Sequence, residues 1–135
     1  MLRPVMIYSL LVMSSPASGQ CALTAARFAR GVLERGHSIR RIFFLDAGTG
    51  NGSATAIFPQ DETDRLQPWV DLAEQHSVEL ILCIASALKY GMLDGTEARR
   101  HEKSAATIHP AFTISGLGQL VDAAASVDRL VTFGG

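Results

Sequence analysis

The residues of this sequence with the clearest capacity for chemistry are its two thiols, Cys21 and Cys83. Two cysteines cannot supply a disulfide framework or the four ligands of a structural zinc site, so each is considered singly. Cys83 ends an apolar, β-favouring run and is followed by residues 85–87, which favour a helix. A helix N-terminus beside a cysteine favours the thiolate, which is the form that attacks sulfur. The position therefore suits a nucleophile.

A structural explanation exists for each cysteine. Cys83 follows Leu and Ile residues, and cysteine is among the most buried residue types, so Cys83 could equally be a small core residue. Cys21 falls in the first turn of the opening helix, beside Ala22, Ala25 and Ala26, where a small sulfur is most simply a packing residue. Position alone leaves the two explanations of Cys83 open.

Other candidate chemistry is weakly supported. Residues 48–52, Gly-Thr-Gly-Asn-Gly, lack the lysine of a phosphate-binding loop, and Ser86 lacks the flanking glycines of a hydrolase nucleophile. Asp94 and Glu97 suit helix capping and pairing with Arg99 or Arg100 better than paired acid and base catalysis. The four histidines are scattered; His37 and His76 are expected to be exposed, and only His101 and His109 lie in the Cys83 half of the chain. No metal site and no organic cofactor are expected.

The elements around Cys83 indicate an α/β fold. Strands are expected from Val5 to Val12 and over residues 39–45, 80–84, 112–115 and 129–133; helices are expected from Ser18 or Gly19 to Gly36 and over residues 61–76, 85–90, 94–103 and 116–125. Residues 48–60 are expected to form a long, flexible loop. Apolar strands that alternate with helices through short connections predict a parallel sheet with helices on both faces. The functional edge of such a sheet lies beyond the carboxyl ends of its strands, where Cys83 falls.

Composition narrows the function classes. The 135 residues suit a single domain spanning 1–135, and 47% hydrophobic residues exclude disorder. Twelve basic and thirteen acidic residues give a net charge of −1, so direct nucleic-acid binding is not expected. The small number of charges instead favours apolar surface buried against other subunits.

The amino-terminal segment imitates a signal peptide or a lipoprotein signal aimed at Cys21. Its positive region is the single Arg3, Gln20 occupies the position where processing requires a small residue, and the apolar run is much shorter than the ~20 residues that span a bilayer. We therefore expect a buried first strand, no membrane association and a cytoplasmic location, where thiols stay reduced.

Several segments together resemble the DsrE family, with the TusD branch as the nearest match. The resemblance extends over nearly the whole chain and is carried by residues 81–91, Asp94, Glu97-Ala98, 112–120, Gly36-His37, Phe43-Phe44, 59–62, Trp69, 128–131 and 133–134. It implies a DsrE-like, flavodoxin-like three-layer fold. It also implies that Cys83 is the sulfur-carrying cysteine of a sulfurtransferase subunit, with Ser86 and Lys89 as supporting residues.

By the same resemblance, the chain would assemble with TusB-like and TusC-like subunits as a dimer of heterotrimers. It would take persulfide sulfur from a TusA-like donor and pass it to a TusE-like acceptor, for 2-thiouridine formation at the wobble position of tRNA. Such a relay needs an accessible, activated thiol and transient protein docking. The family commonly has two basic residues before Gly91; here Lys89 is kept and Tyr90 replaces the second, which leaves Lys89 alone to supply that charge.

Two alternatives remain open. The DsrE protein of bacterial sulfur oxidation shares these motifs and works in a related heterohexamer with DsrF and DsrH. The other alternative is a structural subunit in which Cys83 is an inert core residue and the complex is active through a partner.

Overall fold

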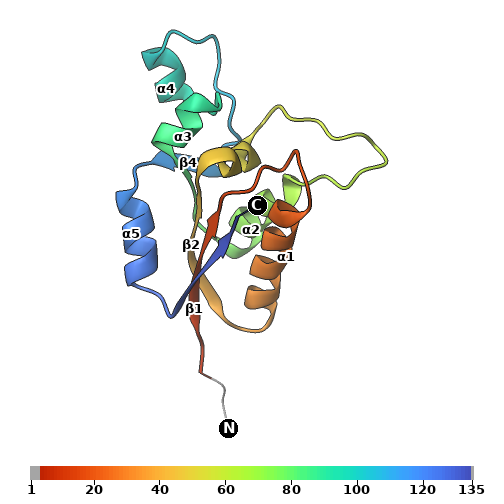
Figure 1. Cartoon of the computed structure of the whole chain (residues 1–135), viewed down its shortest axis with the longest axis vertical. Coiled ribbons are helices and arrows are strands. Elements are labelled where there is room, and N and C mark those ends of the chain that lie inside the picture. Colours follow the sequence, from red (N-terminus) through yellow and green to blue (C-terminus); the bar gives the residue numbers. More distant parts are fainter. Residues whose placement is uncertain (1–3, 135) are drawn as a thin grey trace.

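Five strands form one fully parallel sheet in the computed structural model, which describes residues 4–134 (Figure 1). Their spatial order is β4-β3-β2-β1-β5. The strands are β1 (Ile7–Val12), β2 (Ser38–Phe44), β3 (Leu80–Cys83), β4 (Phe112–Ser115) and β5 (Arg129–Phe133). The α/β fold predicted from the alternation of apolar strands and helices is confirmed.

The helices lie on both faces of the sheet. They are α1 (Cys21–Glu34), the 3₁₀ helix η1 (Asp46–Gly52), α2 (Gln67–His76), α3 (Ile84–Lys89), α4 (Gly95–Arg100) and α5 (Gly118–Ala125). Successive right-handed crossovers from β1 to β3 move in one direction, so α1 and α2 share a face. The connection from β4 to β5 runs back across the sheet, which places α5 on the opposite face (Figure 1).

Side-chain alternation along the strands divides the core into two parts. The larger part contains Phe44 and Leu82 and packs against α1 and α2, with the fully buried Trp69 on the ring of Phe44 at a centroid distance of 5.0 Å. The smaller part lies on the α5 side and consists of Phe43, Ile81 and Cys83. The sulfur of Cys83 is therefore separated from α1 and α2 by the sheet itself.

The prediction of a flexible loop over residues 48–60 is wrong for the first half of that segment. Residues 46–52 form η1, in which Thr49 and Asn51 are completely buried. A side chain at Gly48 would collide with the carbonyl oxygen of Val12, and one at Gly52 with the side chain of Leu82. The glycines are needed because this segment packs directly on the strands. Only the following stretch, in which Ile57 is 92% exposed, projects from the body of the molecule (Figure 1).

Several helix boundaries also differ from the prediction. Helix α2 begins at Gln67 rather than residue 61, because Oδ1 of Asp64 accepts hydrogen bonds from the backbone N–H groups of Leu66 and Gln67, and Pro68 suits the first turn. The predicted helices 94–103 and 116–125 shorten to α4 and α5, and α1 begins at Cys21. The strands agree with prediction to within one or two residues. Among residues 4–134, no helix is long and apolar enough to cross a membrane.

Candidate functional site

Cys83 lies where β3 passes into α3. Its backbone is still extended (φ −62°, ψ 124°), and the helix begins at the next residue, Ile84. The cysteine therefore occupies the carboxyl edge of the parallel sheet, next to the free N–H groups of the first turn of α3. This is the placement predicted from sequence.

The neighbours of Cys83 are mainly apolar. Its side chain belongs to the cluster with Phe43 and Ile81, against which Leu11, Leu45 and Leu120 pack. Ser115 on β4 is its register partner, so a hydroxyl side chain lies on the same face of the sheet beside it. Ser115 lies within residues 112–120, which carry part of the family resemblance, but the sequence predicted no role for it. Only the pairing of β3 with β4 places it next to the thiol.

The cysteine is closed off from solvent, with 2% of its surface exposed. The expectation of an accessible thiol is therefore not met in this conformation of the chain. Leu120, which packs on the Cys83 cluster, comes from α5, a helix in which only Ala123 is fully buried. Of the three leucines packed on this cluster, Leu120 lies on a largely exposed helix, so we expect movement of α5 to be the easiest way to loosen the cover of the sulfur.

Ion pairs hold α5 to the sheet. Asp122 accepts hydrogen bonds from Arg40 at 2.7 Å and from the buried Arg41 at 2.9 Å. Arg41 also donates to the backbone oxygen of Gln119 and pairs with Glu79. The hydrogen bond from Arg40, with the charges of both guanidinium groups, lowers the pKa of Asp122 below its ordinary value of 3.8. At neutral pH the carboxylate is charged and fastens α5 to β2.

Ser86, predicted as a supporting residue, has a structural partner. It is 7% exposed, and its Oγ accepts a 3.0 Å hydrogen bond from the backbone N–H of Asp46. Asp46 has a φ of +51°, a left-handed conformation that is costly for a residue with a side chain. Ser86 thus ties the start of α3 to the strained turn between β2 and η1, and holds the edge of the sheet beside Cys83.

Lys89, the second predicted supporting residue, lies at the other end of α3. Six residues at 1.5 Å each place it about 9 Å along the helix from Cys83. Its side chain is exposed, as is that of Tyr90. The structure therefore does not bring Lys89 to the thiol.

Asn51 is a residue whose importance the sequence reasoning missed. Its Oδ1 accepts a 3.0 Å hydrogen bond from Nε1 of Trp69, and its Nδ2 donates to the backbone oxygens of Ser14 and Gly48. All its bonds are buried, so it joins η1 to α2 and to the end of β1. A polar residue between two glycines resembles loop sequence, and no periodic pattern could have identified it.

The remaining candidate groups do not assemble around Cys83. Cys21 is half-buried at the first turn of α1 and, like Cys83, is a free thiol. His37 is half-buried instead of exposed, because its Nδ1 accepts a hydrogen bond from the backbone N–H of Met6. His109 accepts similarly from Ala111. Within the part of the chain that the structure describes, no group of three or more His, Cys, Asp or Glu side chains is placed to hold a metal ion.

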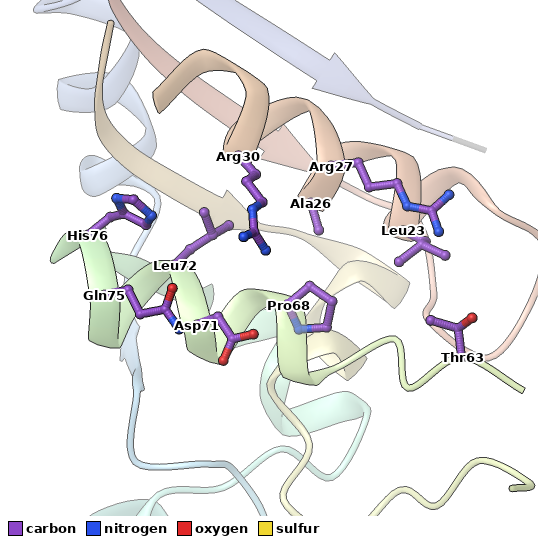
Figure 2. Close-up of a pocket in the computed structure, with 10 residues that line it drawn as sticks. All are labelled: Leu23, Ala26, Arg27, Arg30, Thr63, Pro68, Asp71, Leu72, Gln75 and His76. Carbon is purple, nitrogen blue, oxygen red and sulfur yellow. The ribbon is translucent and has the colours of Figure 1, made fainter. Parts of the chain in front are cut away.

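A groove between α1 and α2 lies on the face of the sheet opposite to Cys83 (Figure 2). Arg27 and Arg30 of α1 form one side, Asp71 and Gln75 of α2 form the other, and Figure 2 shows the guanidinium group of Arg30 directed across it. Charges of both signs line this groove, and the sheet separates it from the thiol. It is not part of the candidate sulfur site.

Comparison with known proteins identifies the family. The model of the DsrE/DsrF-like family matches residues 6–133. The chain is 43% identical over 129 residues to DsrE of Allochromatium vinosum, covering 96% of this chain and 99% of that protein. It is also 43% identical to sulfurtransferase TusD of Serratia proteamaculans, covering 91% and 96%, and 39% identical to the sulfurtransferase TusD homolog of Pseudomonas aeruginosa, covering 93% and 95%.

A solved structure supports the fold alone. The crystal structure of the ychN protein from E. coli superposes with a TM-score of 0.74 at 17% identity, covering 96% of this chain and all of that one. The family match covers residues 6–133, and the relatives match over more than nine-tenths of this chain. The chain belongs to the DsrE/DsrF-like family.

Proposed function

We propose that this chain is a sulfur-relay sulfurtransferase subunit that carries a persulfide on Cys83. The observation that carries the proposal is the position of Cys83, at the carboxyl edge of the sheet where β3 becomes α3. Relatives named sulfurtransferase, similar over more than nine-tenths of the chain, support the transferase role.

The reaction is a thiol exchange that needs no external oxidant. The Cys83 thiolate attacks the outer sulfur of a persulfide on the donor, forming a new S–S bond to Sγ as the S–S bond of the donor breaks. The donor cysteine leaves as a thiolate and takes up a proton. The reverse exchange onto an acceptor thiol releases Cys83 unchanged, so no metal or organic cofactor is called for.

The partners follow from the same proposal. We place a TusA-like protein as donor and a TusE-like protein as acceptor, with 2-thiouridine at the tRNA wobble position as the end use. TusB-like and TusC-like subunits would complete a dimer of heterotrimers, in the cytoplasm. The apolar side chains of Leu117 (55% exposed), just before α5, and Val121 (68% exposed), within it, support a subunit contact on this face. The net charge of −1 supports a subunit that leaves tRNA to others.

A second candidate function is sulfur carriage in dissimilatory sulfur oxidation. The observation that favours it is the 43% identity to DsrE of Allochromatium vinosum, which equals the identity to the Serratia TusD protein. Both functions would use the same persulfide chemistry. They differ in the protein that accepts the sulfur. Comparing the rate of transfer to a TusE-like protein of the thiolation pathway with the rate to a homologous acceptor from a sulfur oxidiser therefore distinguishes the two functions.

The direct test incubates the purified chain with a persulfidated TusA-like protein and measures the intact mass. We expect an added mass of one sulfur atom on the wild type and on Cys21→Ser, and none on Cys83→Ser. Label that persists on Cys83→Ser and disappears from Cys21→Ser would move the site to Cys21. A Cys83→Ser chain that still supports thiolation in its complex would favour the inert-core alternative.

A further inference from the structure

A hollow of about 330 Å³ lies between the end of α3 and the turn after α4. It is lined by Leu88, Lys89, Gly91, Leu93, His101 and Lys103. Figure 1 shows α3 and α4 together at one end of the molecule, beyond the edge of the sheet at which the strands end. The hollow therefore lies at the far end of α3, the helix that begins directly after Cys83.

The walls of the hollow are held by specific bonds rather than by a loose loop. The backbone N–H of Lys103 donates to the oxygen of Ala98 at 2.8 Å, which closes the last turn of α4. Thr107 accepts from the backbone N–H of Leu93 at 2.9 Å and donates its hydroxyl to the oxygen of Gly91. These bonds fix the position of the Lys103 backbone relative to the end of α3.

The side chains around the hollow leave positive charge uncompensated. The carboxylate of Glu97 is 6% exposed and pairs with Arg100 at 2.8 Å; its Oε2 lies 3.3 Å from Nε2 of His101 and forms no hydrogen bond with the described residues. Within residues 4–134, neither Lys89 nor Lys103 forms an ion pair. No acidic side chain lines the hollow, and the nearest carboxylate in sequence, that of the exposed Glu102, is not among its walls.

The structure therefore adds a second positive charge to that of Lys89, which the sequence analysis considered alone. Tyr90 replaces the second basic residue that the family commonly has before Gly91, but Lys103 arrives from the end of α4 to line the same hollow as Lys89. Leu88 and Leu93 line the hollow together with the two lysines, and Tyr90, which follows Lys89 in the sequence, is 52% exposed. Paired cations over apolar surface suit an acidic segment that also carries apolar side chains.

We propose that this hollow, which we call the α3–α4 hollow, anchors an acidic segment of the protein that exchanges sulfur with Cys83. The inference rests on the proposed function and adds the chemistry of the partner. Lys89 lies about 9 Å along α3 from Cys83, so a group bound there is too far away to react but close enough to orient a docked protein. A small anion in the hollow would not reach the sulfur, which favours the protein as occupant.

The test compares two sulfur sources on the same variant. Lys89→Gln/Lys103→Gln removes both charges, and Arg27→Gln/Arg30→Gln removes two charges from the separate groove between α1 and α2 as a matched control. Sulfur transfer is followed by intact mass with a persulfidated TusA-like protein, with a neutral small-molecule persulfide, and in the outward direction to a TusE-like protein.

We expect the lysine variant to slow transfer with at least one of the two proteins about tenfold at low ionic strength, and the loss to shrink in 0.5 M salt. Loading from the neutral small-molecule persulfide should match the wild type, and the arginine variant should behave as wild type throughout. Equal slowing with the small persulfide, equal slowing in the arginine variant, or no slowing with either protein would each overturn the anchoring role. Failure of the wild type to accept sulfur from any source would instead refute the proposed function.

Discussion

We expect opening of the α5 face to control access to Cys83, and Leu120 is the side chain through which this can be tested. Leu120 is half-buried and packs on the cluster of Phe43, Ile81 and Cys83. Replacing it with alanine removes apolar contact that exists only while α5 is closed. Val121, the next residue, is 68% exposed, so Val121→Ala on the same helix is a matched control.

The size of the effect follows from burial. A fully buried Leu→Ala change costs about 2.7–5 kcal/mol, and a half-buried leucine about 1–2 kcal/mol. If that energy is lost from the closed state and not from the open one, the opening equilibrium shifts by the same amount. At 1.4 kcal/mol for each factor of ten, Cys83 of Leu120→Ala should react roughly 5 to 30 times faster than in the wild type.

The assay measures the rate at which N-ethylmaleimide alkylates Cys83 under native conditions in a Cys21→Ser background. The extent of alkylation is read from the intact mass of the protein. Low urea separates local from global opening, because local opening exposes little surface and its rate should hardly respond to urea. Val121→Ala should label at the wild-type rate. Equal rates for Leu120→Ala and wild type, or a rate that rises with urea as steeply as global unfolding, would refute α5 as the cover of the thiol.

Two further predictions concern the bonds that hold this edge of the sheet. Ser86→Ala should lower the free energy of unfolding by about 0.5–1.5 kcal/mol in urea denaturation, because the backbone N–H of Asp46 loses its hydrogen-bond acceptor. Asp46→Gly should recover part of this loss by relieving the left-handed strain, and no recovery would contradict this. Because the pKa of Asp122 is lowered in the folded chain, its charge stabilises the fold above its ordinary value of 3.8, and that stability should fall as pH drops below about 4. Circular dichroism should show a flatter acid dependence for Asp122→Asn than for the wild type, and identical curves would show that its pairs with the arginines are not stabilising.

The sequence predicted the strands well because β1, β3 and the second half of β2 are short, largely buried apolar runs, and such runs carry their own signal. It did not predict η1, whose conformation depends on contacts with distant residues. The buried bonds of Asn51 to Trp69 and Ser14 join segments up to 37 positions apart, and the close approach of Gly48 to Val12 is equally nonlocal. No local pattern of residues 46–52 contains that information.

The same distinction applies to the site. The placement of Cys83 between strand and helix is a local property and was predicted. Its burial was one of two explanations that position alone left open, because the residues packed on its cluster come from distant segments, among them Leu120 of α5. Lys103 was missed as a companion of Lys89, since the turn after α4 brings the two lysines to one hollow.

Burial of Cys83 and the position of the α3–α4 hollow together constrain how a partner could reach the sulfur. A ligand shifts an equilibrium only by the difference between its affinities for the two states. The bonds that build the hollow involve α3, α4 and Thr107, and none of them joins α5. An acidic segment bound there with equal affinity in the closed and open chain would raise the local concentration of the partner without exposing the thiol. We expect exposure to come from a second contact that favours the displaced α5, and the exposed side chains of Leu117, just before that helix, and Val121, within it, are large apolar groups available to make it.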